Sequence, residues 1–140
     1  MTPQEIFDTV ARHLFTQGQR AGIVMDDDPD DIGRGFSCRY RAPGGATCAV
    51  GKLLPDDAYD PGMEGNAVET ICSAYGDMLP TWMLDQQGLL DRLQVVHDTK
   101  DHWVSDERMR WELSLVAVAF GLDDSVLPGL SFNRPEGQNA

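Results

Sequence analysis

Basic residues are scarce in this 140-residue chain: 11 lysines and arginines stand against 23 aspartates and glutamates, for a formal net charge of −12. Nucleic acids and anionic membranes are bound through phosphate groups that Lys and Arg neutralise, so this balance argues against direct binding of either. Acidic proteins associate readily with basic partners, and a groove that normally holds DNA or RNA is a partner of this kind. Solubility alone is the other explanation of the charge.

Long apolar runs are also missing, because no stretch reaches the roughly 18 residues that a transmembrane helix needs. The N-terminal sequence Met-Thr-Pro-Gln-Glu-Ile-Phe-Asp lacks the basic residues and apolar stretch of a secretory signal, so we expect a cytoplasmic protein. The length and the 41% content of hydrophobic residues suit one globular domain over residues 1–130. Residues 131–140 carry no core-forming pattern, which predicts a flexible tail.

Metal-ligand spacing is absent from the three cysteines and three histidines, since neither Cys-x-x-Cys nor His-x-x-x-His occurs. We therefore expect no metal and no cofactor, although His97 and Asp101 share a predicted helix face and leave a two-ligand cluster open. The odd number of cysteines leaves at least one thiol free, as is usual in a reducing compartment. The simplest role for Cys38, Cys48 and Cys72 is that of small apolar core residues.

The spacing of apolar residues predicts a mainly helical protein. Thr2, Pro3 and Glu5 form a capping box with a preset first turn, so a helix begins there and ends at Gly18 or Gly22. Four further helical segments are predicted at residues 48–54, 66–76, 81–99 and 105–120.

The C-terminal helix, residues 105–120, is predicted to be the central one, because its second half is apolar on nearly all sides. Asn66 is the predicted cap of the helix that precedes residue 76, and Gly88 is a candidate break within residues 81–99. The expected fold class is α+β and predominantly α, with four to five helices packed around residues 105–120.

A small β-hairpin is predicted near residues 36–50. Residues 36–41 alternate in the manner of a strand, and Pro43-Gly44-Gly45 is a turn sequence. The return strand would merge into the short helix at 48–54, which Thr47 is placed to cap.

Residues 38–65 mix cysteines, tyrosines, charges and turn formers without a long period, which predicts either a site or an irregular piece of fold. Within it, Tyr40, Tyr59 and Glu64 are candidates for a pocket or a structural loop. Glu64 lies beside a Pro-Gly turn and is either a pocket carboxylate with a raised pKa or an acceptor of backbone N–H bonds.

A cysteine nucleophile is the candidate catalytic arrangement. Cys48 follows a Gly-Gly turn at a predicted helix N-terminus, where the dipole and free N–H groups lower a thiol pKa. His97 is the candidate general base and Asp98 the carboxylate that orients it. A partly buried structural histidine is the alternative for His97, because Leu93 and Val96 share its helix face.

Aspartates gather in two stretches, and these are the candidate contacts for a basic partner. They cannot pack against one another and are expected to lie in solvated loops. The candidates are Asp26, Asp27, Asp28, Asp30, Asp31, Asp56, Asp57 and Asp60.

Taken together, several short motifs resemble an uncharacterised family of small proteins encoded by tailed phages and prophages. The resemblance covers roughly residues 14–100, and its last motif is Leu-Gln-x-x-His-Asp at residues 93–98. The earlier motif residues are Cys38, Tyr40, Arg41, Gly45, Cys48, Ala49, Val50, Gly51, Leu54, Pro55, Asp56, Tyr59, Met63, Glu64 and Gly65. The resemblance implies a phage-borne accessory protein acting inside a bacterial cell, and it carries over no catalytic residues.

Two functions follow from these observations. The first is a non-enzymatic acidic protein that binds, and inhibits, a host defence or nucleic-acid-binding protein through a basic surface of that protein. The second is a Cys-dependent hydrolase or transferase that uses Cys48 with His97. The sequence does not indicate the oligomeric state.

Overall fold

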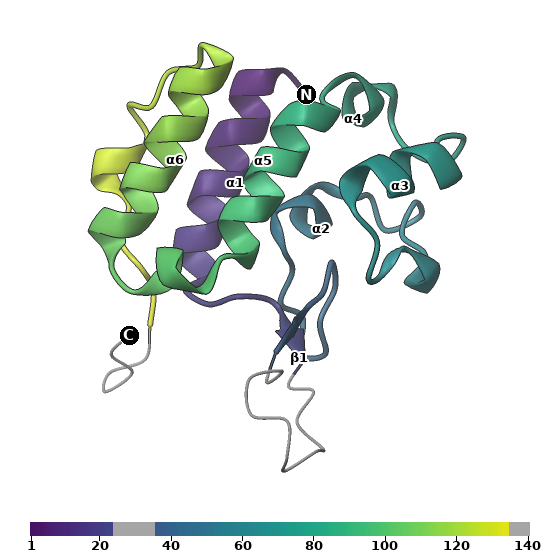
Figure 1. Cartoon of the computed structure of the whole chain (residues 1–140), viewed down its shortest axis with the longest axis horizontal. Helices are drawn as coiled ribbons and strands as arrows, with labels where there is room; N and C mark the ends of the chain where they lie inside the picture. Colours follow the sequence, from purple (N-terminus) through teal and green to yellow (C-terminus); the bar gives the residue numbers. More distant parts are fainter. Residues whose placement is uncertain (24–35, 135–140) are drawn as a thin grey trace.

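The computed structural model describes residues 1–23 and 36–134. Over these ranges the chain forms six α-helices, three 3-10 helices and one two-stranded antiparallel sheet, which confirms an α+β, predominantly α fold (Figure 1). The elements in chain order are α1 Pro3–Gln17, β1 Gly22–Ile23, β2 Ser37–Cys38, α2 Ala49–Leu53, η1 Pro61–Met63, α3 Val68–Ala74, α4 Thr81–Asp85, α5 Gln87–Asp98, η2 Lys100–Trp103, α6 Asp106–Phe120 and η3 Leu127–Gly129.

Helix α1 forms as its sequence predicts. The Thr2 hydroxyl accepts the Glu5 N–H and the Glu5 carboxylate accepts the Thr2 N–H, so both halves of the capping box are present. The helix ends at Gly18, whose φ of 73° is left-handed. A Cβ at Gly18 would lie 2.5 Å from the Asn133 carbonyl oxygen, so glycine also permits the C-terminal segment to approach.

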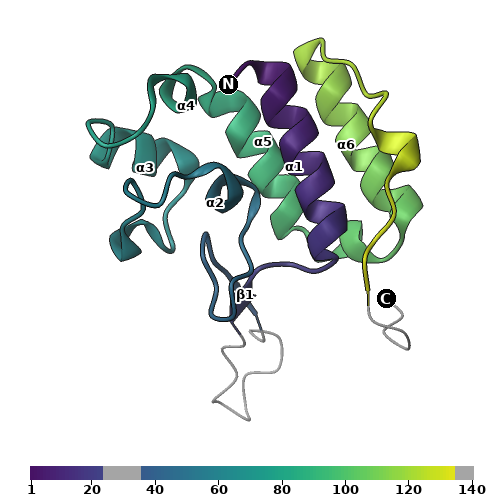
Figure 2. The ribbon, with the colours of Figure 1, turned by 180° about the vertical axis from the view of Figure 1, so that it is seen from behind.

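Helix α5 occupies the central position that the sequence assigned to α6. It contacts α1, α2, α3, α4 and α6, and Leu93 on its inner face is fully buried. Figures 1 and 2 show α1, α5 and α6 as three neighbouring rods, with α2, α3 and α4 on the other side of α5. The helices therefore pack around α5.

Helix α6 lies at the edge of the molecule. Only one of its faces is buried, and this face comprises Met109, Leu113, Val116 and Ala117. Leu115 and Val118, which lie within the apolar run that predicted a central helix, face solvent. No helix in the described parts of the chain is both long enough and apolar enough to cross a lipid bilayer.

The predicted hairpin exists only in part. The two strands of the sheet are β1 and β2, with Gly22 opposite Cys38 and Ile23 opposite Ser37. The return segment after the Pro-Gly-Gly turn contributes one isolated bridge, between Arg41 and Thr47. The strand before the turn therefore pairs with an earlier segment, because the return segment enters α2 almost at once.

Helix α2 packs directly on the backbone of the preceding segment. Its N-cap is Cys48 rather than Thr47, and the Cys48 N–H donates to the Tyr40 carbonyl at 3.3 Å. A Cβ on Gly51 would lie 1.9 Å from the same carbonyl oxygen. Gly51 is therefore required for this close approach.

Two other helix boundaries differ from those expected. Ala67, not Asn66, is the N-cap of α3, and the Asn66 side-chain amide donates instead to the Gly62 carbonyl. The segment predicted at 81–99 does divide, but the break between α4 and α5 falls at Gln86 rather than Gly88.

The start of the expected C-terminal tail is packed on the helices. The Phe132 ring stacks on Phe15 with centroids 4.8 Å apart and on Trp103 with centroids 5.5 Å apart. The Asn133 N–H donates to the Phe15 carbonyl at 2.9 Å. Residues 131–134 therefore belong to the packed structure, because one aromatic side chain anchors them; residues 135–140 lie outside the described ranges.

Candidate functional site

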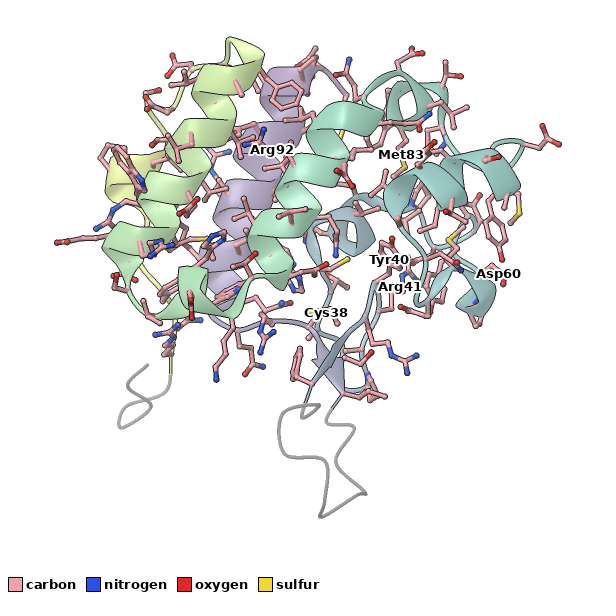
Figure 3. The ribbon with its side chains drawn as sticks, in the orientation of Figure 1. Cys38, Tyr40, Arg41, Asp60, Met83 and Arg92 are labelled. Atoms are coloured by element: carbon pink, nitrogen blue, oxygen red, sulfur yellow. The ribbon has the colours of Figure 1, made fainter. Side chains whose placement is uncertain are left out.

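A cleft of about 370 Å³ lies between α5 and the irregular segment that follows β2. Figure 3 shows Cys38, Tyr40 and Arg41 following one another along this segment. The residues that line the cleft are Cys38, Arg39, Tyr40, Gly65, Asn66, Ala67, Val68, Asp91, Gln94, Val95 and Asp98. The lining residues thus include one thiol, two carboxylates, two side-chain amides and one guanidinium group.

His97 is fully buried at the end of α5 and is bonded through both ring nitrogens. Its Nε2 accepts the Ala21 N–H at 2.9 Å, and its Nδ1 lies 2.7 Å from Asp98 Oδ1. Because a backbone N–H can only donate, Nε2 carries the lone pair and Nδ1 donates to Asp98. Trp103 packs edge-on against the ring at 5.8 Å and donates from Nε1 to the His97 carbonyl. These contacts give His97 a structural role, since its lone pair is already used.

The thiol that lies beside His97 and Asp98 is that of Cys38, not Cys48. The ligand atoms of Cys38, His97 and Asp98 all lie within 4.8 Å of one another. Cys38 is partly buried, and this burial, together with the nearby Asp98 carboxylate, raises the pKa of its thiol to about 11, against an opposing effect of Arg20. The thiol is therefore protonated near neutral pH and is a weak nucleophile.

The same three groups do not fit a metal site in their present arrangement. A neutral histidine that binds a metal through Nδ1 carries its proton on Nε2. In His97 that proton would point at the Ala21 N–H, which now donates to Nε2. The thiol of Cys38 would also have to lose its proton against a raised pKa.

Cys48 is a core residue with a capping role. It is fully buried, and its Sγ accepts the Gly51 N–H at 3.2 Å. Burial raises the pKa of its thiol to about 12, although hydrogen bonds from Gly51 and Gln94 oppose the change. The expected lowering by the helix N-terminus is overturned, because α2 is only five residues long and burial outweighs it. The structure does not join Cys48 to His97 by a hydrogen bond.

The Glu64 carboxylate joins separate parts of residues 38–65 through hydrogen bonds. Its carboxylate accepts the Tyr40 N–H at 2.8 Å, the Arg41 N–H at 3.1 Å and the Tyr59 hydroxyl at 2.7 Å. The Tyr40 hydroxyl in turn donates to the Asn66 carbonyl. Of the two roles that the sequence left open for Glu64, the structure shows the acceptor of backbone N–H bonds.

Arg41 adds a second set of contacts to this loop. Its guanidinium group lies over the Tyr59 ring, 4.6 Å from the centroid, and donates to the Leu54 carbonyl at 3.0 Å. It also pairs with Asp56 at 3.0 Å. The tyrosines, Glu64 and Arg41 therefore make residues 38–65 an irregular piece of fold whose side chains bond to its own backbone.

The candidate acidic contacts have different environments. The Asp56 side chain is 98% exposed although it pairs with Arg41, and Asp57 is exposed. Asp60 accepts the Gly62 N–H at 2.7 Å and so caps η1; Figure 3 shows it on the far side of the loop from α5. Asp26, Asp27, Asp28, Asp30 and Asp31 lie outside the described residues.

Sequence reasoning missed Cys38 as the thiol beside His97. No pattern in the sequence identifies Cys38 as this thiol. Its position beside His97 depends on the pairing of β2 with β1, and a strand of two residues is too short to show a periodic pattern. The cleft offers a protonated thiol and hydrogen-bonding groups, while the neighbouring His97 does not line it and is engaged by the backbone. Comparison with protein-family models, with curated proteins and with solved structures finds no match to this chain.

Proposed function

We propose that this chain is a non-enzymatic, phage-borne acidic protein that binds a host protein through a basic surface of that protein and inhibits it. The net charge of −12 supports this function, because opposite charge speeds encounter and favours basic partners. The resemblance of its motifs to small phage proteins supports the setting in a bacterial cell.

The observation that carries the proposal is that the side chains suited to catalysis are used to build the fold. Cys48 caps α2 from the core, and both nitrogens of His97 are bonded. His13 donates from Nε2 to the Thr47 carbonyl at 2.9 Å, and His102 from Nδ1 to the Val96 carbonyl at 3.1 Å. These four groups are bonded within the fold, which favours a function carried by the surface.

Carboxylates are distributed widely over that surface, which suits contact with a basic groove. The exposed acidic residues in the described ranges include Asp56, Asp57, Glu69, Asp77, Asp85, Asp91, Asp98, Asp101, Glu107, Asp123 and Asp124. Carboxylates presented in this way can take the place of phosphate groups opposite Lys and Arg.

A pull-down of the tagged chain from bacterial lysate at low and high salt, with mass spectrometry, tests the proposal. We expect one stoichiometric host protein with a basic surface, whose affinity for the purified chain falls about tenfold or more when salt is raised. Reversing many exposed carboxylates together, Asp56 and Asp57 among them, to lysine removes the net negative charge and should weaken binding, whereas Cys48→Ser should leave binding unchanged. Recovery of no partner at either salt would contradict the proposal.

The second candidate function is a Cys-dependent hydrolase or transferase, and one observation favours it: a thiol, His97 and Asp98 meet at the edge of a cleft. In the structure the thiol in this group is Cys38 rather than Cys48. Turnover of an acyl or thioester substrate that Cys38→Ser abolishes and Cys48→Ser preserves would establish this function and exclude the binder.

A further inference from the structure

Helix α6 carries an apolar stripe on its outer face. Trp111, Leu115 and Val118 are spaced by four and three residues, so they lie on one side of the helix. Their exposed fractions are 61%, 41% and 77%. Neighbouring exposed apolar side chains with polar residues around them often mark a site of interaction.

A groove of about 370 Å³ runs beside the stripe, between α6 and the segment that leads into η3. Trp111 forms one wall of it, and Leu127 and Pro128 supply apolar surface on the other side. The groove is lined by Glu107, Arg110, Trp111, Ser114, Asp124, Leu127 and Pro128. Its volume suits one or two large apolar side chains from another molecule.

Negative charges outnumber positive ones around the groove. Arg108 is paired with Glu112 at 3.0 Å. Arg110 lines the groove and donates to the Leu130 carbonyl, so it keeps its positive charge against the two carboxylates of Glu107 and Asp124. Glu107 and Asp124 are exposed, and neither carboxylate has an ion-pair or hydrogen-bond partner within residues 1–23 and 36–134. The apolar surface thus has an acidic rim whose carboxylates are available to an incoming cation.

We propose that this groove and stripe form the contact surface for an amphipathic basic helix of the host partner, with large apolar side chains on one face and Lys or Arg beside them. The apolar face would cover Trp111, Leu115 and Val118, while its cations approach Glu107 and Asp124. The inference rests on the proposed function, because it names the surface through which the acidic chain engages a basic protein.

A second copy of the chain fits this surface less well. A two-fold interface places the same patch on both subunits, so the acidic rim of one copy would face the acidic rim of the other. Each copy would also bring a net charge of −12 to the other, which opposes association. Charge therefore selects a basic partner.

Titration of ¹⁵N-labelled full-length chain with three synthetic peptides of about 14 residues tests the inference, since this length supports an amphipathic helix. The first peptide combines leucines at helical spacing with lysines; the second replaces leucine by serine; the third replaces lysine by glutamate. We expect the first peptide alone to shift the indole N–H of Trp111 and the backbone signals of α6.

Variants locate the contact. Trp111→Ser and Val118→Ser remove exposed side chains and should each weaken binding about tenfold. Glu107→Lys with Asp124→Lys should weaken it about tenfold at low salt, whereas Glu69→Lys with Asp77→Lys, the same charge change on and after α3, should weaken it less than about threefold.

The outcomes separate this inference from the proposed function. Shifts confined to Asp56, Asp57 and Asp60, with Trp111→Ser unaffected, would overturn the α6 surface and leave an acidic binder in place. Absence of binding to any lysine-containing peptide would count against both proposals. A concentration-dependent dimer in sedimentation that Trp111→Ser abolishes would overturn the inference in favour of a second copy.

Discussion

In the long helices α1, α5 and α6 the buried side chains are almost all apolar, whereas residues 38–65 depend on bonds between side chains and backbone. Leu93 in α5 is fully buried against its neighbours. In the irregular segment, by contrast, the single carboxylate of Glu64 accepts bonds from Tyr40, Arg41 and Tyr59. Polar side chains can therefore hold the backbone in a defined conformation by hydrogen bonds where no long helix or sheet does so.

The two regions also suggest different functions, catalysis in the cleft and recognition on the surface of α6. The cleft is lined by thiol, carboxylate and amide groups, which are types suited to catalysis. The histidine behind it, His97, is buried outside the lining, and it is bonded to the Ala21 N–H and to the Asp98 carboxylate. The apolar residues of α6 predict a buried helix, yet its outer face leaves Trp111 and Val118 in solvent. The surface of the regular part is thus the better candidate for recognition.

The largest effect is expected from Leu93→Ala in α5. The change removes a fully buried side chain from the helix that contacts most others, so the free energy of unfolding should fall by about 3 to 4 kcal/mol. Urea unfolding followed by circular dichroism and by tryptophan fluorescence should show the two transitions moving together. A loss below about 1 kcal/mol would show that α5 is not central.

Gly51→Ala breaks the junction between the two regions. The added methyl group would meet the Tyr40 carbonyl 1.9 Å away, so α2 and residues 38–41 must separate, at a cost of about 2 to 3 kcal/mol. Hydrogen exchange should show faster exchange in residues 38–53 than in α1 and α6. Gly129→Ala, where a Cβ meets no atom within 4 Å, is the matched control.

Glu64→Ala affects the irregular segment alone. Two backbone N–H groups and the Tyr59 hydroxyl lose their acceptor, which should cost about 2 kcal/mol. The amides of Tyr40 and Arg41 should exchange faster while those of α1 are unchanged. Glu69→Ala removes the same charge from an exposed site on α3 and should change stability by less than about 0.5 kcal/mol; equal effects of the two variants would contradict the anchoring role.

The helices could be predicted from the sequence, because caps and periodic apolar residues act locally. Thr2 and Glu5 cap α1 as their positions indicate, and Gly121 ends α6 with a left-handed φ of 66°, which favours glycine. The central place of α5 could not be predicted, because the apolar run at residues 113–120 shows how many sides of α6 are apolar but not which side is covered.

The site could be predicted only in part, because one of its contacts is local in the sequence and the other is not. His97 and Asp98 are adjacent in the chain and do meet, whereas their thiol partner is set by the pairing of β1 with β2. That sheet has two residues in each strand, too few for an alternating pattern. The choice between Cys38 and Cys48 therefore depends on tertiary structure alone.

If the buried thiols are parts of the fold and not nucleophiles, they should react slowly, and site-resolved alkylation of the native protein with iodoacetamide measures this. Burial raises the pKa of Cys38 to about 11 and that of Cys48 to about 12, and only the thiolate reacts. We expect both to react at least about 100-fold more slowly than a free cysteine at pH 8, with the rate at Cys38 rising about tenfold per pH unit up to about pH 10. Fast modification of Cys38 or Cys48 at pH 7, with a rate that levels off below pH 8, would show a thiol of low pKa and indicate a catalytic one.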